Sequence, residues 1–219
     1  MRLTIYGRSV VTKALVLTLL IDFAAILVPV LIIKLILLIL SILLFGFVIF
    51  FFRDPVRILP DGVKENDIIS PADGRVMMIE EIEEDLFLKS KAKMIGIFLS
   101  PLNVHINRLP VSGRIELLKY VRGGYAAAFK HELSESNERT LIGITNEKFK
   151  VMFKQIAGYV ARRIVCTLQT GDMVRQGEKF GMIKFGSRVD VIIPLGSVIK
   201  VSINQHVKGG LTILAEVNT

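Results

Sequence analysis

An almost continuous apolar run at residues 10–52 constrains the fold of this chain more than any other feature of its sequence. A bilayer core of about 30 Å is crossed by about 20 helical residues that rise about 1.5 Å each. The run of 43 residues is therefore about twice as long as one crossing requires. Pro29 and Lys34 interrupt it near the middle, where a proline ends a helix and a lysine reaches the polar headgroups. We predict two transmembrane helices, near residues 10–29 and 33–52, in a membrane anchor that covers residues 1–52.

Basic residues flank this run on both sides, with Arg2 and Arg8 before it and Arg53 and Arg57 after it. Such residues favour the cytoplasmic face of a membrane. Both ends of the hairpin, and the soluble part that follows, are therefore expected on the cytoplasmic side of the cell membrane. A secretory signal peptide is the alternative, but the run is too long and no small-residue cleavage site precedes the charged exit at residues 52–55.

The soluble part, residues 53–219, contains short apolar or alternating runs that are often bounded by Gly, Pro, Asp or Asn. These runs are too short and too rich in β-branched residues for a helical bundle. They predict strands at residues 75–82, 93–99, 113–121, 140–144, 149–156, 189–193, 198–203 and 211–215. We expect one mainly β domain, an antiparallel sandwich or barrel, with short helices near residues 101–107 and 157–163.

Two glycine-containing stretches, at residues 171–177 and 207–210, are similar to turns in lipoyl- and biotinyl-type β-sandwiches. Those carrier domains display a modified lysine at a hairpin tip, and no such tip is evident in this sequence. The likeness to a lipoyl domain is therefore distant. Ordinary hairpin turns, in which glycine adopts positive φ, explain the same pattern.

Composition narrows the cofactors and partners. Cys166 is the only cysteine, which excludes an internal disulfide and any multi-cysteine zinc or iron–sulfur site. The formal net charge of +8 suits a domain that lies against anionic lipid. Nucleic acid is the other partner for such a charge, but the sequence has no binding motif or aromatic stacking cluster for it. We therefore expect a membrane partner and no nucleic acid.

Three segments carry residues suited to catalysis, and each is common on its own. Residues 70–74, Ser-Pro-Ala-Asp-Gly, are typical of a turn. Residues 98–110 place His105 between a strand-like run and a proline-bounded turn. Histidine can move protons near neutral pH, although a single histidine is more often structural. Residues 181–194 contain Gly186-Ser187. The Ser187 hydroxyl lies next in sequence to the Gly186 carbonyl, and glycine can adopt backbone conformations that other residues cannot.

Taken together and in this order, the three segments resemble those of the phosphatidylserine decarboxylases, in the short form that many bacteria and archaea share. That form includes archaetidylserine decarboxylases, and its members also begin with membrane helices. The likeness covers essentially the whole soluble part, with further matching stretches at residues 51–55, 137–139 and 158–166. The resemblance implies decarboxylation of phosphatidylserine, or archaetidylserine, to the corresponding ethanolamine lipid and CO₂.

Members of this family make their own pyruvoyl cofactor, and the bond they cleave matches Gly186–Ser187. The resemblance implies that the Ser187 hydroxyl attacks the Gly186 carbonyl, and that residue 187 becomes a pyruvoyl group that forms a Schiff base with the substrate. Because serine is a weak nucleophile it needs a base, and Asp73 and His105 are the candidates. His105 is also the expected proton donor during decarboxylation, and no metal is required.

The same resemblance implies two chains after cleavage, a β chain of residues 1–186 and an α chain of residues 187–219. The two would remain together as a heterodimer, and a higher oligomer is an open alternative. The substrate would be a phospholipid in the membrane.

One departure from the family pattern leaves undecided which residue takes the proton from the Ser187 hydroxyl. Longer members have a second histidine three positions after the one that matches His105, and this chain has Arg108 there. We expect Asn103, Arg108 and Arg163 to contact the substrate. Arg163 would attract the lipid phosphate, since guanidinium groups suit bidentate contacts with anions. Residues 137–139 are expected to order a loop that faces the substrate.

Two other functions remain as alternatives. The first is a membrane-anchored, non-catalytic β domain that binds lipid or protein. The second is a pyruvoyl decarboxylase for a soluble amino acid, which the two-helix anchor makes less natural. Whether the Gly186–Ser187 bond is cut distinguishes the first alternative from a decarboxylase.

Overall fold

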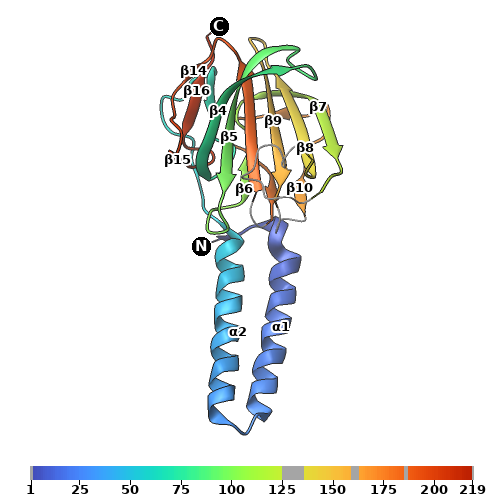
Figure 1. Ribbon diagram of the computed structural model, residues 1–219, viewed down its shortest axis with the longest axis vertical. Coiled ribbons are helices and arrows are strands. Elements are labelled where there is room, and N and C mark those ends of the chain that lie inside the picture. The colour runs from blue at the N-terminus through green and yellow to red at the C-terminus, as the bar shows by residue number, and fades with distance from the viewer. Residues whose placement is uncertain (1, 125–135, 159–162, 185–186, 219) are drawn as a thin grey trace. The chain divides into compact units, whose positions relative to one another are not determined.

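A computed structural model describes residues 2–124, 136–158, 163–184 and 187–218 of the chain (Figure 1). It divides into two compact units, Met1–Val56 and Arg57–Thr219. The first unit is helical, and the second is built almost entirely from strands.

The first unit is a helical hairpin. Its helices are α1 (Arg8–Leu27) and α2 (Leu31–Phe51), preceded by the short 3-10 helix η1 (Ile5–Gly7). Strands β1 (Arg2–Leu3) and β2 (Arg53–Asp54) pair antiparallel and join the two ends of the hairpin. Both helices are long and apolar enough to cross a membrane. The predicted pair of helices is confirmed to within two residues at each end, with Pro29 in the connection between them.

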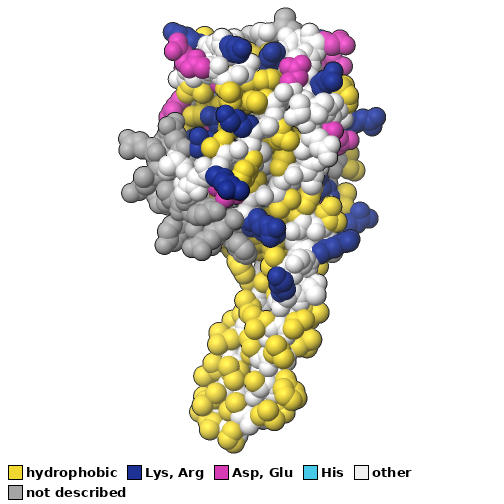
Figure 2. All heavy atoms as spheres, turned by 90° about the vertical axis from the view of Figure 1, so that its right-hand side faces the viewer, with side chains coloured by type: hydrophobic (Ala, Val, Ile, Leu, Met, Phe, Trp, Pro, Cys, Tyr) yellow, Lys and Arg dark blue, Asp and Glu magenta, His cyan; other side chains and the backbone are white. Residues whose placement is uncertain are grey.

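Small side chains form the contact between the two helices. Ala14, Thr18 and Ala25 of α1 and Ser41 of α2 are buried, and the Ser41 hydroxyl lies 3.5 Å from the carbonyl oxygen of Thr18. Large apolar side chains lie on the outside instead, as Figure 2 shows for the visible face of the hairpin. Membrane helices associate in this way, because lipid tails are as apolar as leucine and close packing of small residues holds the helices together.

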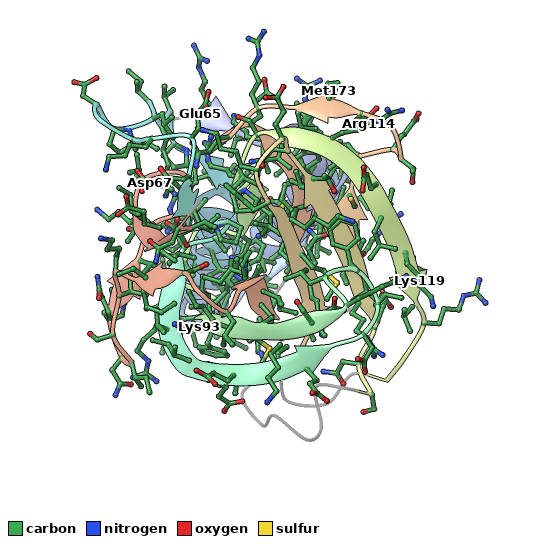
Figure 3. The ribbon with its side chains drawn as sticks, turned by 90° about the horizontal axis from the view of Figure 1, so that it is seen from above. Glu65, Asp67, Lys93, Arg114, Lys119 and Met173 are labelled. Atoms are coloured by element: carbon green, nitrogen blue, oxygen red, sulfur yellow. The ribbon has the colours of Figure 1, made fainter. Side chains whose placement is uncertain are left out.

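The second unit contains an eight-stranded antiparallel sheet in the order β11-β7-β8-β9-β13-β5-β4-β15. The sheet curls around its own core, as the view from above shows (Figure 3). Strand β13 lies in the middle, hydrogen-bonded to β9 on one side and β5 on the other. The bounds are β4 Gly74–Glu84, β5 Ser90–Leu99, β7 Gly113–Val121, β8 Arg139–Thr145, β9 Lys150–Ala157, β11 Met173–Val174, β13 Ser187–Pro194 and β15 His206–Val207.

Two three-stranded sheets complete this unit. One has the order β10-β12-β6, from Ile164–Cys166, Lys179–Ile183 and Ile106–Arg108, and the other has the order β14-β16-β3, from Val198–Ile199, Ile213–Glu216 and Asp67–Ile69. Phe153 of β9 packs edge-on against Phe180 of β12, with ring centroids 5.4 Å apart. Each buried residue of this size contributes about 1.5–3 kcal/mol. The predicted mainly β, antiparallel fold is confirmed.

Three of the predicted elements differ from the structure, and several short strands, among them β3, β10 and β12, were not predicted. The helix predicted near residues 101–107 is wrong, because residues 100–103 form a turn and the chain then enters β6. The helix predicted near residues 157–163 begins on the last residue of β9, and residues 159–162 of it lie outside the described part of the chain. The strand predicted at residues 198–203 ends at Ile199, since the chain turns at Asn204 with φ of 71°.

The glycine-rich stretches form turns, as ordinary hairpin chemistry predicts. Gly171, Gly177 and Gly210 all have positive φ, at 99°, 82° and 77°. This backbone conformation is open to glycine at no steric cost and is unfavourable for most other residues. The pattern at residues 171–177 and 207–210 therefore has a sufficient local explanation.

Candidate active site

Ser187 begins strand β13 in the centre of the large sheet. It lies opposite Leu99 of β5 and Ala157 of β9, on the same face as the core residue Val189. The side chain is completely buried, and its Oγ has no hydrogen-bond partner within the described residues. A buried hydroxyl without a partner costs about 1–3 kcal/mol. Gly186, the other residue of the predicted cleavage bond, lies outside the described residues.

His105 is also completely buried, and its immediate contacts fix the role of its ring nitrogens. Its Nδ1 lies 2.9 Å from the carbonyl oxygen of Asn103. Because a carbonyl oxygen only accepts hydrogen bonds, Nδ1 must carry the hydrogen, and in the neutral ring Nε2 is then the proton acceptor. The His105 carbonyl accepts from the Ile183 amide at 3.3 Å. His105 thus lies beside the segment that leads to Ser187.

Asp73 lies in the turn before β4 and is held in an ion pair. Its two carboxylate oxygens accept hydrogen bonds from the Arg57 guanidinium, with Nη2 2.7 Å from Oδ2, and Oδ1 also accepts from the Gly209 amide at 2.9 Å. Arg75, two residues later, opposes Phe98 of β5, which opposes Arg188 of β13. The Asp73 turn is thus two strands from the start of β13, or about 10 Å.

The three residues predicted to contact the substrate, Asn103, Arg108 and Arg163, differ in their surroundings. Asn103 closes the turn before His105, since its Oδ1 accepts from the Ser100 amide at 2.8 Å. Arg108 donates from Nη1 to the Gly177 carbonyl oxygen at 2.9 Å. Because side chains alternate along β6, Arg108 lies on the side of the strand away from Asn107. Arg163 is exposed on the surface.

Two buried amides near Ser187 were not among the predicted site residues. Gln155 of β9 donates from Nε2 to Oδ1 of Asn107 on β6 at 2.9 Å, and also to the Val165 carbonyl oxygen at 3.3 Å. Both amide side chains are completely buried. Gly181 leaves room for the Val165 carbonyl, since a Cβ there would lie 2.0 Å from its oxygen and 3.2 Å from Gln155 Nε2. A glutamine at an inward position of the run 149–156 was the available sequence signal.

Asn137 supports the strand beside Ser187. Its Nδ2 donates to the Ala157 carbonyl oxygen at 2.8 Å, and the Ala157 amide donates to the Glu138 carbonyl at 2.9 Å. Ala157 is the residue that opposes Ser187. The stretch 137–139, predicted to order a loop, therefore holds the end of β9 in place.

Arg188 and Asp190 form a buried ion pair on the opposite face of β13. Nε of Arg188 lies 2.5 Å from Oδ1 of Asp190, and Nη2 lies 2.8 Å from Oδ2. The two side chains are only 2% and 3% exposed. Such a bidentate pair has both of its carboxylate oxygens bound by the guanidinium.

Burial also shifts two titratable groups near this site. The pKa of Lys184, three residues before Ser187, is lowered. Burial is the larger cause, and the positive charge of Arg163 is the smaller one. Burial raises the pKa of the Cys166 thiol, although a backbone hydrogen bond at Leu168 partly opposes the shift. A thiol with a raised pKa is a poor nucleophile, so Cys166 acts as a core residue.

Comparison with known proteins identifies the family. Residues 44–215 match the family model described as phosphatidylserine decarboxylase. The chain belongs to the phosphatidylserine decarboxylase family. It is 46% identical over 178 residues to a protein of Chlorobium limicola, which covers 81% of this chain and 82% of that protein. The predicted resemblance is confirmed, and family membership identifies the chain as a decarboxylase.

Two further relatives agree. A protein of Chlorobium luteolum is 43% identical over 213 residues, 97% of this chain and 99% of its own length. A protein of Carboxydothermus hydrogenoformans is 46% identical over 176 residues, 80% of this chain and 82% of its own length. All three relatives are named phosphatidylserine decarboxylase proenzyme.

A surface cavity of this decarboxylase lies far from Ser187. The cavity, of about 630 Å³, lies between β7, β11 and the β8–β9 turn. Arg114 and Met173 lie side by side at its rim (Figure 3), in agreement with their pairing. It is at the Lys150 end of β9, whereas Ala157, opposite Ser187, is at the other end. Strand rise makes this separation about 24 Å, so the cavity is not part of the site around Ser187.

The described residues contain no cluster of three or more His, Cys, Asp or Glu side chains that could hold a metal ion.

Proposed function

We propose that this chain is a phosphatidylserine decarboxylase precursor. It cleaves itself between Gly186 and Ser187 and then converts phosphatidylserine to phosphatidylethanolamine and CO₂ with a pyruvoyl group at residue 187. The names of the relatives support this substrate and the precursor form. The observation that carries the proposal is the buried Ser187 hydroxyl, which has no partner in the described part of the chain.

Self-cleavage uses atoms of the chain itself. Ser187 Oγ gives up its proton and bonds to the Gly186 carbonyl carbon, while the peptide C–N bond breaks and the nitrogen gains a proton. Removal of the Cα proton of residue 187 then breaks the Cβ–O bond and releases the Gly186 carboxylate. Addition of water to the remaining dehydroalanine, with loss of ammonia, leaves a pyruvoyl group.

His105 is the proposed base for this reaction. Its Nδ1 is bound to the Asn103 carbonyl, which leaves Nε2 to accept a proton in the neutral ring. A positioned base of this kind typically contributes about 10²–10⁴-fold to a rate. Asp73 is the second candidate for the base. The Arg57 guanidinium already donates hydrogen bonds to both of its carboxylate oxygens, so Ser187 would have to compete with Arg57 for them.

The surroundings of Ser187 fit a pyruvoyl group. Ser187 packs between Leu99 and Ala157 on adjacent strands, and a keto oxygen in place of the serine hydroxyl and nitrogen is no bulkier. A pyruvoyl carbonyl supplies an electron sink for the electron pair that CO₂ leaves behind. His105 would hold the proton that is delivered to the carbon from which CO₂ departs.

The remaining parts of the proposal concern assembly and location. Residues 1–186 and 187–219 would stay together as a heterodimer of β and α chains, with a higher oligomer as an open alternative. The two apolar helices would anchor the protein in the cell membrane that holds its phospholipid substrate. The flanking residues Arg2, Arg8 and Arg53 favour a cytoplasmic β domain.

Intact mass spectrometry of the purified protein tests this function. We expect a fragment of residues 187–219 whose mass is lower, by one ammonia molecule, than that of the unmodified peptide with the same sequence. We also expect phosphatidylethanolamine to form from added phosphatidylserine. A single uncut chain of 219 residues that makes no product would contradict the proposal and favour a non-catalytic lipid- or protein-binding domain.

A further inference from the structure

The hydrogen bonds of Gln155 and Asn107 fix which way both amides point. The Val165 carbonyl oxygen can only accept, so the Gln155 atom 3.3 Å from it must be the nitrogen. That nitrogen also donates to Asn107 at 2.9 Å, so the bound Asn107 atom is its oxygen. The other two atoms of the pair, Asn107 Nδ2 and Gln155 Oε1, are therefore a donor and an acceptor.

Neither of these two atoms has a hydrogen-bond partner in the part of the chain that the structure describes, although both are completely buried. Native proteins pair nearly all buried polar atoms, and each exception needs a reason. Ser187 Oγ is a third such atom. Gln155 opposes Val189 while Ala157 opposes Ser187, so Gln155 and Ser187 are diagonal neighbours on one face, about 7–8 Å apart and within reach of a long side chain.

His105 lies close to the same pair. The pairing of β6 with β12 places Asn107 opposite Gly181 and Ile106 opposite Met182, and it continues to the His105 carbonyl, which accepts from Ile183. His105 precedes Asn107 by two residues, so their side chains project to the same side of this extended segment. Gln155, contacting Asn107 from β9, shows that this side faces the large sheet.

We propose that Asn107 and Gln155 bind the serine head group of the lipid substrate, an inference that rests on the proposed function. Asn107 Nδ2 donates to the substrate carboxylate, and Gln155 Oε1 accepts from its ammonium group. One donor and one acceptor match the two charged groups of an amino acid. The ethanolamine head group of the product lacks the carboxylate, so it loses the bond to Asn107.

A neutral donor suits a carboxylate that must leave as CO₂. The negative charge is localised on the carboxylate in the bound substrate and moves away from it in the transition state. A cation at this position would stabilise the substrate more than the transition state and slow the reaction. An amide orients the carboxylate without that penalty, so Asn107 contributes mainly to head-group binding.

Asn107→Asp tests the inference most directly. Asp keeps the oxygen that accepts from Gln155, but it replaces the outward donor by an oxygen that repels the substrate carboxylate. We expect normal release of the 187–219 fragment and a rise of about 10- to 100-fold in KM for phosphatidylserine, the loss expected for a hydrogen bond to a charged group. The change in kcat should be smaller.

Gln155→Met and a matched control complete the set. Gln155→Met removes the acceptor for the ammonium group and should also raise KM. Gln176→Met is the control, because Gln176 also donates to main-chain carbonyls, of Asp67 and Pro110, but it lines the distant cavity. Its KM should stay at the wild-type value.

Competition with soluble head groups separates binding from a structural effect. The wild-type enzyme should be inhibited more strongly by glycerophosphoserine than by glycerophosphoethanolamine, and Asn107→Asp should lose this preference. Asn107→Ser, which shortens the side chain, serves the same purpose if the Asp variant does not fold.

Two results would overturn the inference while leaving the proposed function intact. One is a wild-type KM and an unchanged preference in a cleaved Asn107→Asp enzyme. The other is a folded variant that fails to release the fragment, which would assign the pair to self-cleavage. If the wild-type chain itself neither cleaves nor makes phosphatidylethanolamine, the proposed function has failed.

Discussion

The two faces of strand β13 treat buried polar groups in opposite ways. On one face the hydroxyl of Ser187 is buried among core residues and has no hydrogen-bond partner within the described residues. On the other face, one residue later, Arg188 binds both carboxylate oxygens of Asp190 at 2.5 and 2.8 Å. Adjacent residues of one strand thus carry an unsatisfied polar atom and a satisfied ion pair.

This difference separates groups that support the strand from groups available for chemistry. A buried ion pair in which both carboxylate oxygens are bound is costly to break. A buried polar atom without a partner is costly to keep, and the proposed reaction is the reason for keeping it. Substitutions on the two faces should therefore fail in different ways, through stability on one face and through chemistry on the other.

Ser187→Ala should have the largest effect, because it removes the proposed nucleophile and the precursor of the cofactor. We expect a folded, uncut chain without decarboxylase activity, shown by intact mass and by assay of phosphatidylethanolamine. Ser197→Ala is the control, since Gly196-Ser197 repeats the dipeptide and the Ser197 hydroxyl donates to the Pro194 carbonyl instead. Normal activity in Ser187→Ala would exclude a pyruvoyl mechanism at this residue.

His105→Ala should reduce turnover by about 10²–10⁴-fold, the usual contribution of a positioned acid or base. Measuring fragment release and turnover separately shows which step needs His105. His206→Ala is the matched control, because His206 is exposed on β15. If His105→Ala cleaves and turns over at the wild-type rate, His105 is not the proton-transfer group.

Asp190→Ala should act on stability, since it leaves the Arg188 charge buried without its carboxylate. Breaking such a pair costs about 3–5 kcal/mol, measurable as a lower urea midpoint of the detergent-solubilised protein. The double variant Arg188→Met/Asp190→Leu, which replaces both charges, should recover most of this loss. Equal midpoints for the wild type and Asp190→Ala would show that the pair contributes nothing.

Glu216 provides a partly exposed counterpart to the buried pair. Hydrogen bonds and charge interactions with Lys200 and Lys64 lower the pKa of Glu216, at distances of 3.0 and 3.2 Å. A carboxylate with a lowered folded-state pKa stabilises the fold above its ordinary pKa near 4.5, and this contribution is lost as pH falls through the folded value.

Glu216→Gln should therefore lower the melting temperature slightly at pH 7 and leave it unchanged at a pH below both values. Concentrated salt should shrink the difference at pH 7, because exposed pairs are screened. An effect at pH 7 as large as that of Asp190→Ala would contradict the distinction between exposed and buried pairs.

Local patterns were enough to predict most of the fold. The apolar run with Pro29 at its centre predicted both helices, and alternation at residues 113–121 gave β7 with its observed bounds. The helix predicted near residues 101–107 failed because the turn depends on a specific bond, from the Ser100 amide to Asn103 Oδ1. Side-chain hydrogen bonds of this kind compete with helix formation and are not visible in hydrophobic periodicity.

The site was less predictable, because its contacts join distant parts of the chain. The motifs drew attention to Ser187, His105 and Asp73, but the ion pair between Asp73 and Arg57 has no sequence signal. The contact between Gln155 and Asn107 joins strands of two different sheets across 48 positions. Only the packing of one sheet on the other brings these two amides together.

The position of β13 in the sheet also bears on whether folding precedes the proposed cleavage. Residues 187–219 supply the middle strand β13, the edge strand β15, and β14 and β16 of a second sheet. A short chain made separately would have to insert a strand between β9 and β5 of the large sheet while also pairing at its β4 edge. If the proposed cleavage occurs, this strand order favours folding of the whole chain before the cut, and each 187–219 chain would then stay with the 1–186 chain with which it was synthesised.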